Sequence, residues 1–337
     1  MHALQEAPRA AWTELATVLG LEARTVARRY DQLRADGLLL VTQTVGPRLL
    51  AQTRWAVLRV VTRPGTAERV AQELARWPQA TSIRVVDGAF QVYALIAAQA
   101  SRADVEDIRT LWEQAQARIV EIPEIEQADV LHILDAFDVG RAGRLDVLSK
   151  AQVQQLHDLR GQLAASPGRE PAELTDEDLE LFTLLARDGR REVADCAVAL
   201  GRNRSWVSRR IARLQADGLL DFIALTPDVA SSRPVTALVW ASVPAAELPA
   251  LAHRVGSLGW IGMMAVTTGP SNVFAVTHLP TSRALTDALV ELVEVCPSLV
   301  VKETQLSVRA VKIHTRITDE RERFTEQAAQ PYALELL

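Results

Sequence analysis

Residues 19–39 read LGLEARTVARRYDQLRADGLL, and residues 200–220 read LGRNRSWVSRRIARLQADGLL. Of the 21 aligned positions, 11 are identical, at an offset of 181 residues. The same offset places Gly88 opposite Gly269. Between the repeated stretch and this glycine, the aligned positions mostly carry residues of the same chemical type. A period this long does not suit a solenoid. The chain is therefore predicted to contain a two-part unit that occurs twice.

The repeated stretch is typical of a helix-turn-helix. In the second copy, a short helix ends near Leu200, residues 201–203 form a turn, and a second helix is expected over residues 204–216. Asn203 precedes that helix and is a favourable N-cap, whereas its counterpart Glu22 is a poorer one. We therefore expect the second copy to be the better formed of the two.

The second helix of each copy is rich in arginine. Residues 200–216 contain five arginines and no acid, which gives +5 in a chain of net charge −5, and residues 19–35 carry +2. Arginine in a helix that enters the major groove can bond guanine or phosphate. The expected DNA contacts are Arg204, Ser205, Trp206, Ser208, Arg209 and Arg210, with Arg24, Thr25, Arg28 and Arg29 as weaker counterparts.

Three features of this surface have two interpretations. Arg210 and Arg29 contact either phosphate or an acidic neighbour. Trp206 either packs on a neighbour or touches DNA. The whole arginine face is either a DNA-binding surface or a solvated face of an ordinary helix pair, and its occurrence twice at one offset favours DNA binding.

The second part of each unit alternates between strand and helix. Residues 55–61, 82–86 and 90–96 are expected strands in the first unit, with a helix that buries Val70 and Leu74 after the first strand. The order β-α-β-β-α-β predicts a ferredoxin-like sandwich. The fold class expected is α+β, with two winged helix-turn-helix domains and two ferredoxin-like domains.

The predicted domain boundaries follow the repeat. The expected segments are a helix-turn-helix domain (1–50), a ferredoxin-like domain for effector binding and oligomerisation (54–137), a connector with a helix (138–173), a second helix-turn-helix domain (174–228), a second ferredoxin-like domain (234–316) and a tail (317–337). A capping box at Thr175 and Asp178 is expected to begin the first helix of the second unit.

Composition excludes several classes of protein. The net charge of −5 excludes a uniformly basic coat, and two cysteines cannot build a disulfide framework. No apolar run approaches the roughly 20 residues of a membrane span. The six histidines are scattered, and no phosphate-binding loop or nucleophile elbow occurs. We therefore expect a cytoplasmic protein that is not an enzyme, with no metal, no cofactor and no membrane partner.

The helix-turn-helix resembles that of Lrp/AsnC (feast/famine) transcription regulators. The resemblance is carried by residues 174–190, by Leu200-Gly201, by Val207-Ser208-Arg209-Arg210-Ile211 and by Asp217-Gly218-Leu219. It implies a DNA-binding regulator that forms homo-oligomers and binds a small effector near the turn between the second and third strands of each sandwich. The corresponding effector-site positions are Asp87, Gly88, Gln91, Thr268, Gly269 and Asn272.

Two departures from the family matter. The first unit lacks about seven residues of its first helix, so either the chain starts upstream or this domain is trimmed. The family places an aspartate three residues after the turn glycine, whereas this chain has Gln91 and Asn272. Because a neutral amide cannot pair with an ammonium group as a carboxylate does, an amino-acid effector is not favoured, unless Asp87 beside Gly88 supplies the charge. The alternative is that Gly88 and Gly269 are only turn glycines with a positive φ.

Two alternatives and one topological question stay open. Siroheme decarboxylases have the same two-part fold, but this chain has no histidine near either turn. A scaffold that has lost DNA binding is the other alternative. The two sandwiches are expected to pair either within one chain or between chains.

Overall fold

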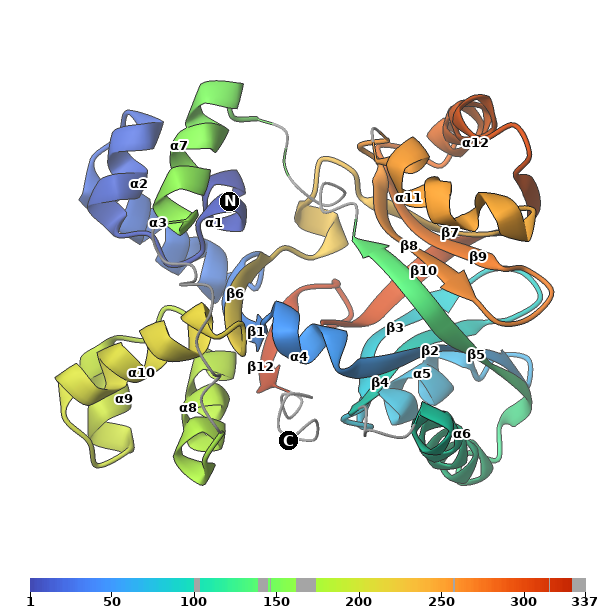
Figure 1. The fold of residues 1–337 in the computed structure, drawn as a ribbon, viewed down its shortest axis with the longest axis horizontal. Coiled ribbons are helices and arrows are strands. Elements are labelled where there is room, and N and C mark those ends of the chain that lie inside the picture. Colours follow the sequence, from blue (N-terminus) through green and yellow to red (C-terminus); the bar gives the residue numbers. More distant parts are fainter. Residues whose placement is uncertain are drawn as a thin grey trace. The chain divides into compact units, whose positions relative to one another are not determined.

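The computed structural model describes residues 1–99, 104–138, 145, 147–161, 174–256, 258–314 and 316–328. It is a mixed α+β protein, which confirms the class expected (Figure 1). The chain divides into two compact units. The bundle unit comprises residues 1–53, 145–227 and 323–337, and the sheet unit comprises residues 54–144 and 228–322. Each unit combines segments of both repeats. The helical parts of the two repeats form one unit, and their strand-helix parts form the other.

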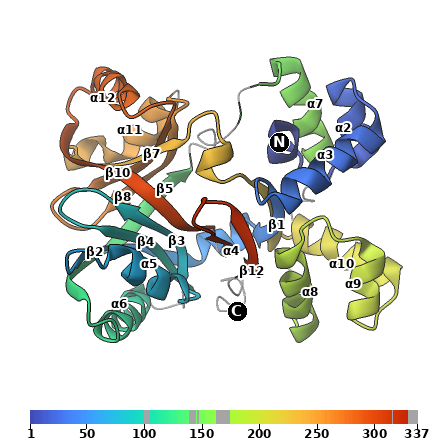
Figure 2. The ribbon, with the colours of Figure 1, turned by 180° about the vertical axis from the view of Figure 1, so that it is seen from behind.

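The bundle unit contains two groups of three helices, which Figure 2 shows from behind. The first bundle consists of α1 (His2–Glu6), α2 (Trp12–Leu19) and α3 (Ala23–Ala35). The second bundle consists of α8 (Asp176–Arg187), α9 (Val193–Ala199) and α10 (Arg204–Ala216). The bounds of α10 are those expected from the sequence, and α1 has five residues where α8 has 12.

The strands that follow α3 and α10 join the two bundles. β1 (Leu40–Val45) pairs antiparallel with β6 (Leu220–Leu225), and the short α4 (Pro47–Ala51) follows β1. Leu40 lies opposite Leu225, and Thr44 lies opposite Asp221. Asp221 is the counterpart of Leu40, and Leu225 is the counterpart of Thr44, so the two pairings are equivalent by the repeat. The expected wings are thus not separate hairpins, because each strand takes its partner from the other repeat.

The predicted connector helix completes the first bundle. It is α7 (Lys150–Gly161), shorter than the range 144–165 expected, although residues 144, 146 and 162–165 lie outside the described part. Leu156 of α7 is fully buried in one core with Leu4 and Leu15. Burial of a leucine contributes about 1.5–3 kcal/mol. The connector helix therefore contributes to the apolar core of the first bundle.

The sheet unit contains the β-α-β-β-α-β order twice. The first copy consists of β2 (Thr53–Thr62), α5 (Ala67–Ala75), β3 (Ala80–Val86), β4 (Val92–Gln99), α6 (Asp104–Val120) and β5 (Ile125–Asp138). The second copy consists of β7 (Val235–Ser242), α11 (Leu248–Val255), β8 (Ile261–Thr267), β9 (Val273–Leu279), α12 (Ala284–Val295) and β10 (Val300–Ile313). Val70 and Leu74 of α5 are fully buried against the first copy, as expected. Two short strands follow, β11 (Arg316–Thr318) in the sheet unit and β12 (Phe324–Ala328) in the bundle unit.

The eight long strands close on themselves. Their order is β10-β3-β4-β2-β5-β8-β9-β7, and β7 pairs again with β10. The junctions β5–β8 and β10–β3 are antiparallel and join strands of different repeats. Closure leaves these strands without free edges. The two sandwiches thus pair within one chain.

Both junctions have the same register. Ile133 lies opposite Thr267, and its counterpart Ser307 lies opposite Val86. Each junction shifts register at the next residue. Ile133 and Ser307 are 174 positions apart, whereas the remaining anchors are 181 apart. The 181-residue offset therefore does not extend to the last strand, where the second repeat is shorter.

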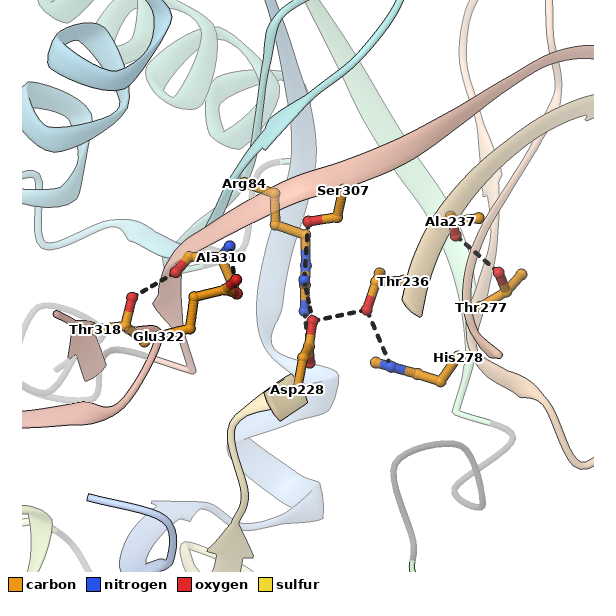
Figure 3. A network of polar contacts seen from close by, with 10 residues as sticks. All are labelled: Arg84, Asp228, Thr236, Ala237, Thr277, His278, Ser307, Ala310, Thr318 and Glu322. Atoms are coloured by element: carbon orange, nitrogen blue, oxygen red, sulfur yellow. Dashed lines mark hydrogen bonds and ion pairs between the residues drawn. The ribbon is translucent and has the colours of Figure 1, made fainter. Parts of the chain in front are cut away.

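A buried polar network lies inside the sheet unit (Figure 3). Arg84 of β3 donates to Asp228 Oδ2 at 2.6 Å and to Ser307 Oγ at 3.2 Å. Thr236 Oγ1 donates to the same carboxylate at 2.8 Å and lies 3.2 Å from His278 Nδ1. The Arg84 and Asp228 side chains are only 5% and 11% exposed. The network therefore ties the segment that begins the second half of the sheet unit to strand β3.

Candidate nucleic-acid interface

The turn between α9 and α10 has the geometry expected of a helix-turn-helix. Asn203 is extended, and its Oδ1 accepts a hydrogen bond from Trp206 N at 2.8 Å, which satisfies a free donor of α10. Glu22 makes no side-chain cap on α3. Val207 and Leu214 are fully buried. The opposite face of α10 is exposed, including Ser205 and Ser208.

Three of the five arginines around α10 are neutralised by acidic neighbours. Arg202 pairs with Glu177, and Arg213 pairs with Asp217. Arg210 binds Asp178, whose carboxylate is buried and also accepts a hydrogen bond from Thr175 N at 2.8 Å. The capping box at Thr175 and Asp178 is confirmed. Trp206 packs on a neighbour, with the Arg202 guanidinium 5.3 Å from its ring centre.

Two arginines of this helix have no acidic partner among the described residues. Within the described residues, Arg204 and Arg209 are exposed and form no ion pair or hydrogen bond. The charge of +5 expected from the sequence is thus reduced to two unpaired guanidinium groups. These two side chains can bond bases or phosphates without breaking an existing interaction.

The Arg210–Asp178 pair orients α10 on α8. The pKa of Asp178 lies below its usual value; burial opposes this shift, and the bonds from Arg210 and Thr175 outweigh it. Arg210→Ala is expected to lower the free energy of unfolding by about 1–2 kcal/mol, because a charge-assisted bond is lost at a partly exposed arginine. Urea denaturation measures this change. An unchanged midpoint would contradict a structural role for Arg210.

The first bundle exposes three free arginines. Arg24, Arg28 and Arg29 form no ion pair within the described residues. Arg29 is the counterpart of Arg210, but among the described residues no carboxylate pairs with Arg29 as Asp178 pairs with Arg210. The same sequence position is therefore structural in one repeat and free to bind an anion in the other. Arg28 and its counterpart Arg209, one in each repeat, both form no ion pair within the described residues.

A reciprocal arginine clasp connects the two bundles. Arg9 donates to Gly189 O at 2.9 Å, and its counterpart Arg190 donates to Pro8 O at 2.6 Å, where Pro8 is the counterpart of Gly189. Arg190 also stacks on Trp12, with its guanidinium 3.6 Å from the ring centre. Sequence reasoning missed this pair, and the 181-residue offset between the two arginines was its only signal.

The amides expected to face an effector are used inside the chain. Gln91 accepts from Thr62 N at 3.1 Å and donates to Gly88 O at 2.8 Å. Asn272 accepts from Val243 N at 3.0 Å and donates to Val243 O at 2.9 Å. Each amide thus braces the turn against the strand that begins its own sandwich.

The remaining predicted residues of these turns form hydrogen bonds with the other repeat. Asp87 Oδ1 accepts from Leu306 N at 2.6 Å, and Thr268 Oγ1 accepts from His132 N at 3.0 Å. Gly88 and Gly269 have φ values of 92° and 101°. A Cβ at Gly269 would lie 2.9 Å from a Leu131 methyl carbon. The glycines are needed for the turn and the close approach.

Leu131 lies in the cluster that fills the space between the sandwiches. Tyr93 and its counterpart Phe274 have ring centres 5.3 Å apart, and Trp240 lies 4.3 Å from Phe274. Arg59, the counterpart of Trp240, stacks on that indole and binds Asp129 at 2.7 Å. The interior of the ring is therefore packed with side chains of both repeats.

The predicted domain boundaries extend past the described residues. Parts of the connector (139–144, 146 and 162–173) and of the tail (329–337) lie outside them. Among the described residues, no helix is long and apolar enough to cross a membrane.

Comparisons with known proteins give a family-model match to the start of the chain and full-length matches in fold. Residues 1–34 match the AsnC-type helix-turn-helix domain. No curated protein matches the chain. The siroheme decarboxylase NirDL, in co-complex with an iron-uroporphyrin III analogue, aligns with a TM-score of 0.58 and 15% identity over 98% of this chain and 93% of that one. At this identity the likeness concerns the fold.

Single-unit regulators align with part of the chain. The leucine response regulatory protein of Mycobacterium tuberculosis gives a TM-score of 0.36 and 20% identity over 40% of this chain and 93% of its own. The feast or famine regulatory protein Rv3291c of M. tuberculosis, complexed with L-methionine, gives a TM-score of 0.38 and 21% identity over 41% of this chain and 93% of its own.

Proposed function

Because residues 1–34 match an AsnC-type helix-turn-helix, as the resemblance to Lrp/AsnC regulators implies, we propose that this chain is a sequence-specific DNA-binding transcription regulator. In this proposal it has two helix-turn-helix domains, whose wing strands β1 and β6 pair with each other, and two ferredoxin-like domains. It acts in the cytoplasm and catalyses no reaction. The observation that carries the proposal is the pair Arg28 and Arg209. These counterparts are exposed and unpaired on the helix that a helix-turn-helix places in the major groove.

One chain supplies both DNA-binding helices in this proposal. The β1–β6 pair and the arginine clasp hold the two bundles in one unit, so a pseudo-palindromic site can be bound by a single chain. The two halves of the site are expected to differ, because Ser205 and Trp206 stand opposite Arg24 and Thr25. An operator with two unlike half-sites follows from these differences.

Arg209→Ala is expected to weaken binding to the operator by roughly 1–3 kcal/mol, the range for a bidentate base contact. Arg28→Ala is expected to cost less, because α3 lacks a side-chain cap. Fluorescence anisotropy with DNA from upstream of the gene, at two salt concentrations, measures both. Arg187→Gln is the control, since Arg187 is an exposed arginine of α8 and is not among the predicted DNA contacts.

The outcomes are distinct. Affinity above that for random DNA, reduced by Arg209→Ala and kept by Arg187→Gln, supports the proposal. Equal affinity for the upstream DNA and random DNA contradicts sequence-specific binding. An equal loss for Arg28→Ala contradicts the weaker role of the first bundle.

Siroheme decarboxylation is a second candidate, favoured only by the full-length fold match. A tetrapyrrole needs an open site, whereas Tyr93, Phe274 and Trp240 fill the centre of the ring. His278 is bonded to Thr236 within the buried network. A visible absorption band that saturates when iron-uroporphyrin III is added would support this candidate over the regulator.

A further inference from the structure

A cavity of about 400 Å³ lies within the bundle unit. Its walls come from four places: the α1–α2 connection, the start of α4, the end of α7, and the end of α10 with the start of β6. A volume of this size suits a small metabolite. Both bundles and the connector helix therefore contact the same space.

Cationic side chains line this cavity. Arg9 donates to Gly189 O at 2.9 Å and lies 4.7 Å from the centre of the Phe222 ring, but it has no carboxylate partner among the described residues. Burial lowers the pKa of Arg9. Arg48 donates its Nε to Asp217 O at 3.2 Å, and its terminal nitrogens have no partner in the described part of the chain.

The carboxylates at the cavity are already engaged. Asp221 binds Arg160 at 2.7 Å, and Asp217 pairs with Arg213, which lies outside the lining. Within the lining, Arg9 and Arg48 thus have no carboxylate partner among the described residues, although Asp188 acts on Arg9 from outside the lining. Because burial disfavours the charge of Arg9 and exposed Arg48 adds a second positive charge at the same cavity, an anion at this place is favoured.

We propose that this cavity binds a small organic anion, with a carboxylate or phosphate head at Arg9 and Arg48 and an apolar body. The apolar lining includes Leu159, Leu220 and Phe222. A guanidinium matches either head group with two parallel hydrogen bonds. This site is separate from the turns at Gly88 and Gly269, which lie in the sheet unit.

The place of the cavity gives the anion a regulatory role, and this part rests on the proposed function. The lining includes Asp217 and Gly218 at the end of α10, and Pro8 and Arg9 from the first bundle. An anion that binds there contacts both groups of helices. It therefore changes DNA affinity if the two bundles differ in position between the free and DNA-bound states.

Binding is tested by calorimetry on the full chain without DNA. The probes are benzoate and phenyl phosphate, and benzamide is the uncharged control. We expect saturable binding of at least one anion, with a Kd at or below about 1 mM, and at least tenfold weaker binding of benzamide. Absence of saturable binding by both anions, or equal binding of benzamide, overturns the proposal.

Variants locate the site. Arg48→Gln is expected to weaken anion binding by roughly 10–100-fold, since a charge-assisted bond is lost at an exposed side chain. Arg9→Gln is expected to do the same if circular dichroism shows a folded chain. Arg187→Gln is expected to bind as the parent does, and a loss in Arg187→Gln equal to that in Arg48→Gln overturns the assignment.

DNA binding in the presence of saturating anion separates the two hypotheses. A change in operator affinity that Arg48→Gln removes supports regulation through this cavity. Calorimetric binding with no change in operator affinity keeps the site and rejects its regulatory role. If no specific DNA binding exists, the proposed function fails, and the calorimetric result for the site still stands.

Discussion

Replacing Arg84 with alanine is expected to lower the free energy of unfolding by about 3–5 kcal/mol, because it leaves the Asp228 carboxylate buried without its cation. The Arg84 guanidinium and that carboxylate each stabilise the charged form of the other. Burial opposes the charge of Asp228, but Arg84 and Thr236 keep the pKa of the carboxyl below its usual value. Figure 3 shows the pair at the centre of the network.

Urea denaturation followed by circular dichroism measures the loss. Arg63→Ala is the matched control, because Arg63 is an exposed arginine of the same unit. The double variant Arg84→Met with Asp228→Leu is expected to recover most of the loss, since a buried ion pair can often be replaced by apolar side chains of similar volume. A loss below about 1 kcal/mol in Arg84→Ala would show that the pair contributes little.

The second large effect is acid destabilisation through His278. Burial, with Arg84 and Arg233 nearby, lowers the pKa of His278 to about 4, although Asp228 opposes the shift. In the unfolded chain the imidazole titrates near its ordinary value of about 6.5. Between these two values the unfolded state binds more protons, so stability falls as the pH is lowered from about 6.5 to about 4. The full contribution is about 3 kcal/mol.

The measurement is a series of urea denaturations between pH 7.5 and pH 4. These pH values bracket the ordinary and lowered pKa of a buried histidine. His278→Asn removes one of two such groups and is expected to make the profile less steep, because burial also lowers the pKa of His314 to about 4. His253→Gln changes an exposed histidine and is expected to leave the profile unchanged. A profile for His278→Asn as steep as that of the parent would exclude His278 as the cause.

Local signals in the sequence were sufficient for most elements. Helix α10 begins after Asn203 because its amide caps a free N–H, and it ends before Gly218, which adopts a positive φ. Strand and helix periodicity predicted the β-α-β-β-α-β order, with bounds within a few residues of the structure. These features depend on residues only a few positions apart.

The roles of single charged residues needed the tertiary structure. Arg210 and Arg29 occupy the same position in the two repeats, but among the described residues only Arg210 has a carboxylate partner. Gln91 and Asn272 looked like effector ligands and instead bond the backbone. In each case the partner belongs to another element, and a motif by itself does not indicate it.

The sequence alone determined that the chain contains one unit twice and that each unit has a helical part and a strand-helix part. Only the tertiary structure decided that like parts pair within the chain, through β1–β6, β5–β8 and β10–β3. The physical reason is that hydrophobic periodicity identifies which face of an element is buried but not which surface covers it. The matching surface here belongs to the other repeat, more than a hundred residues away along the chain.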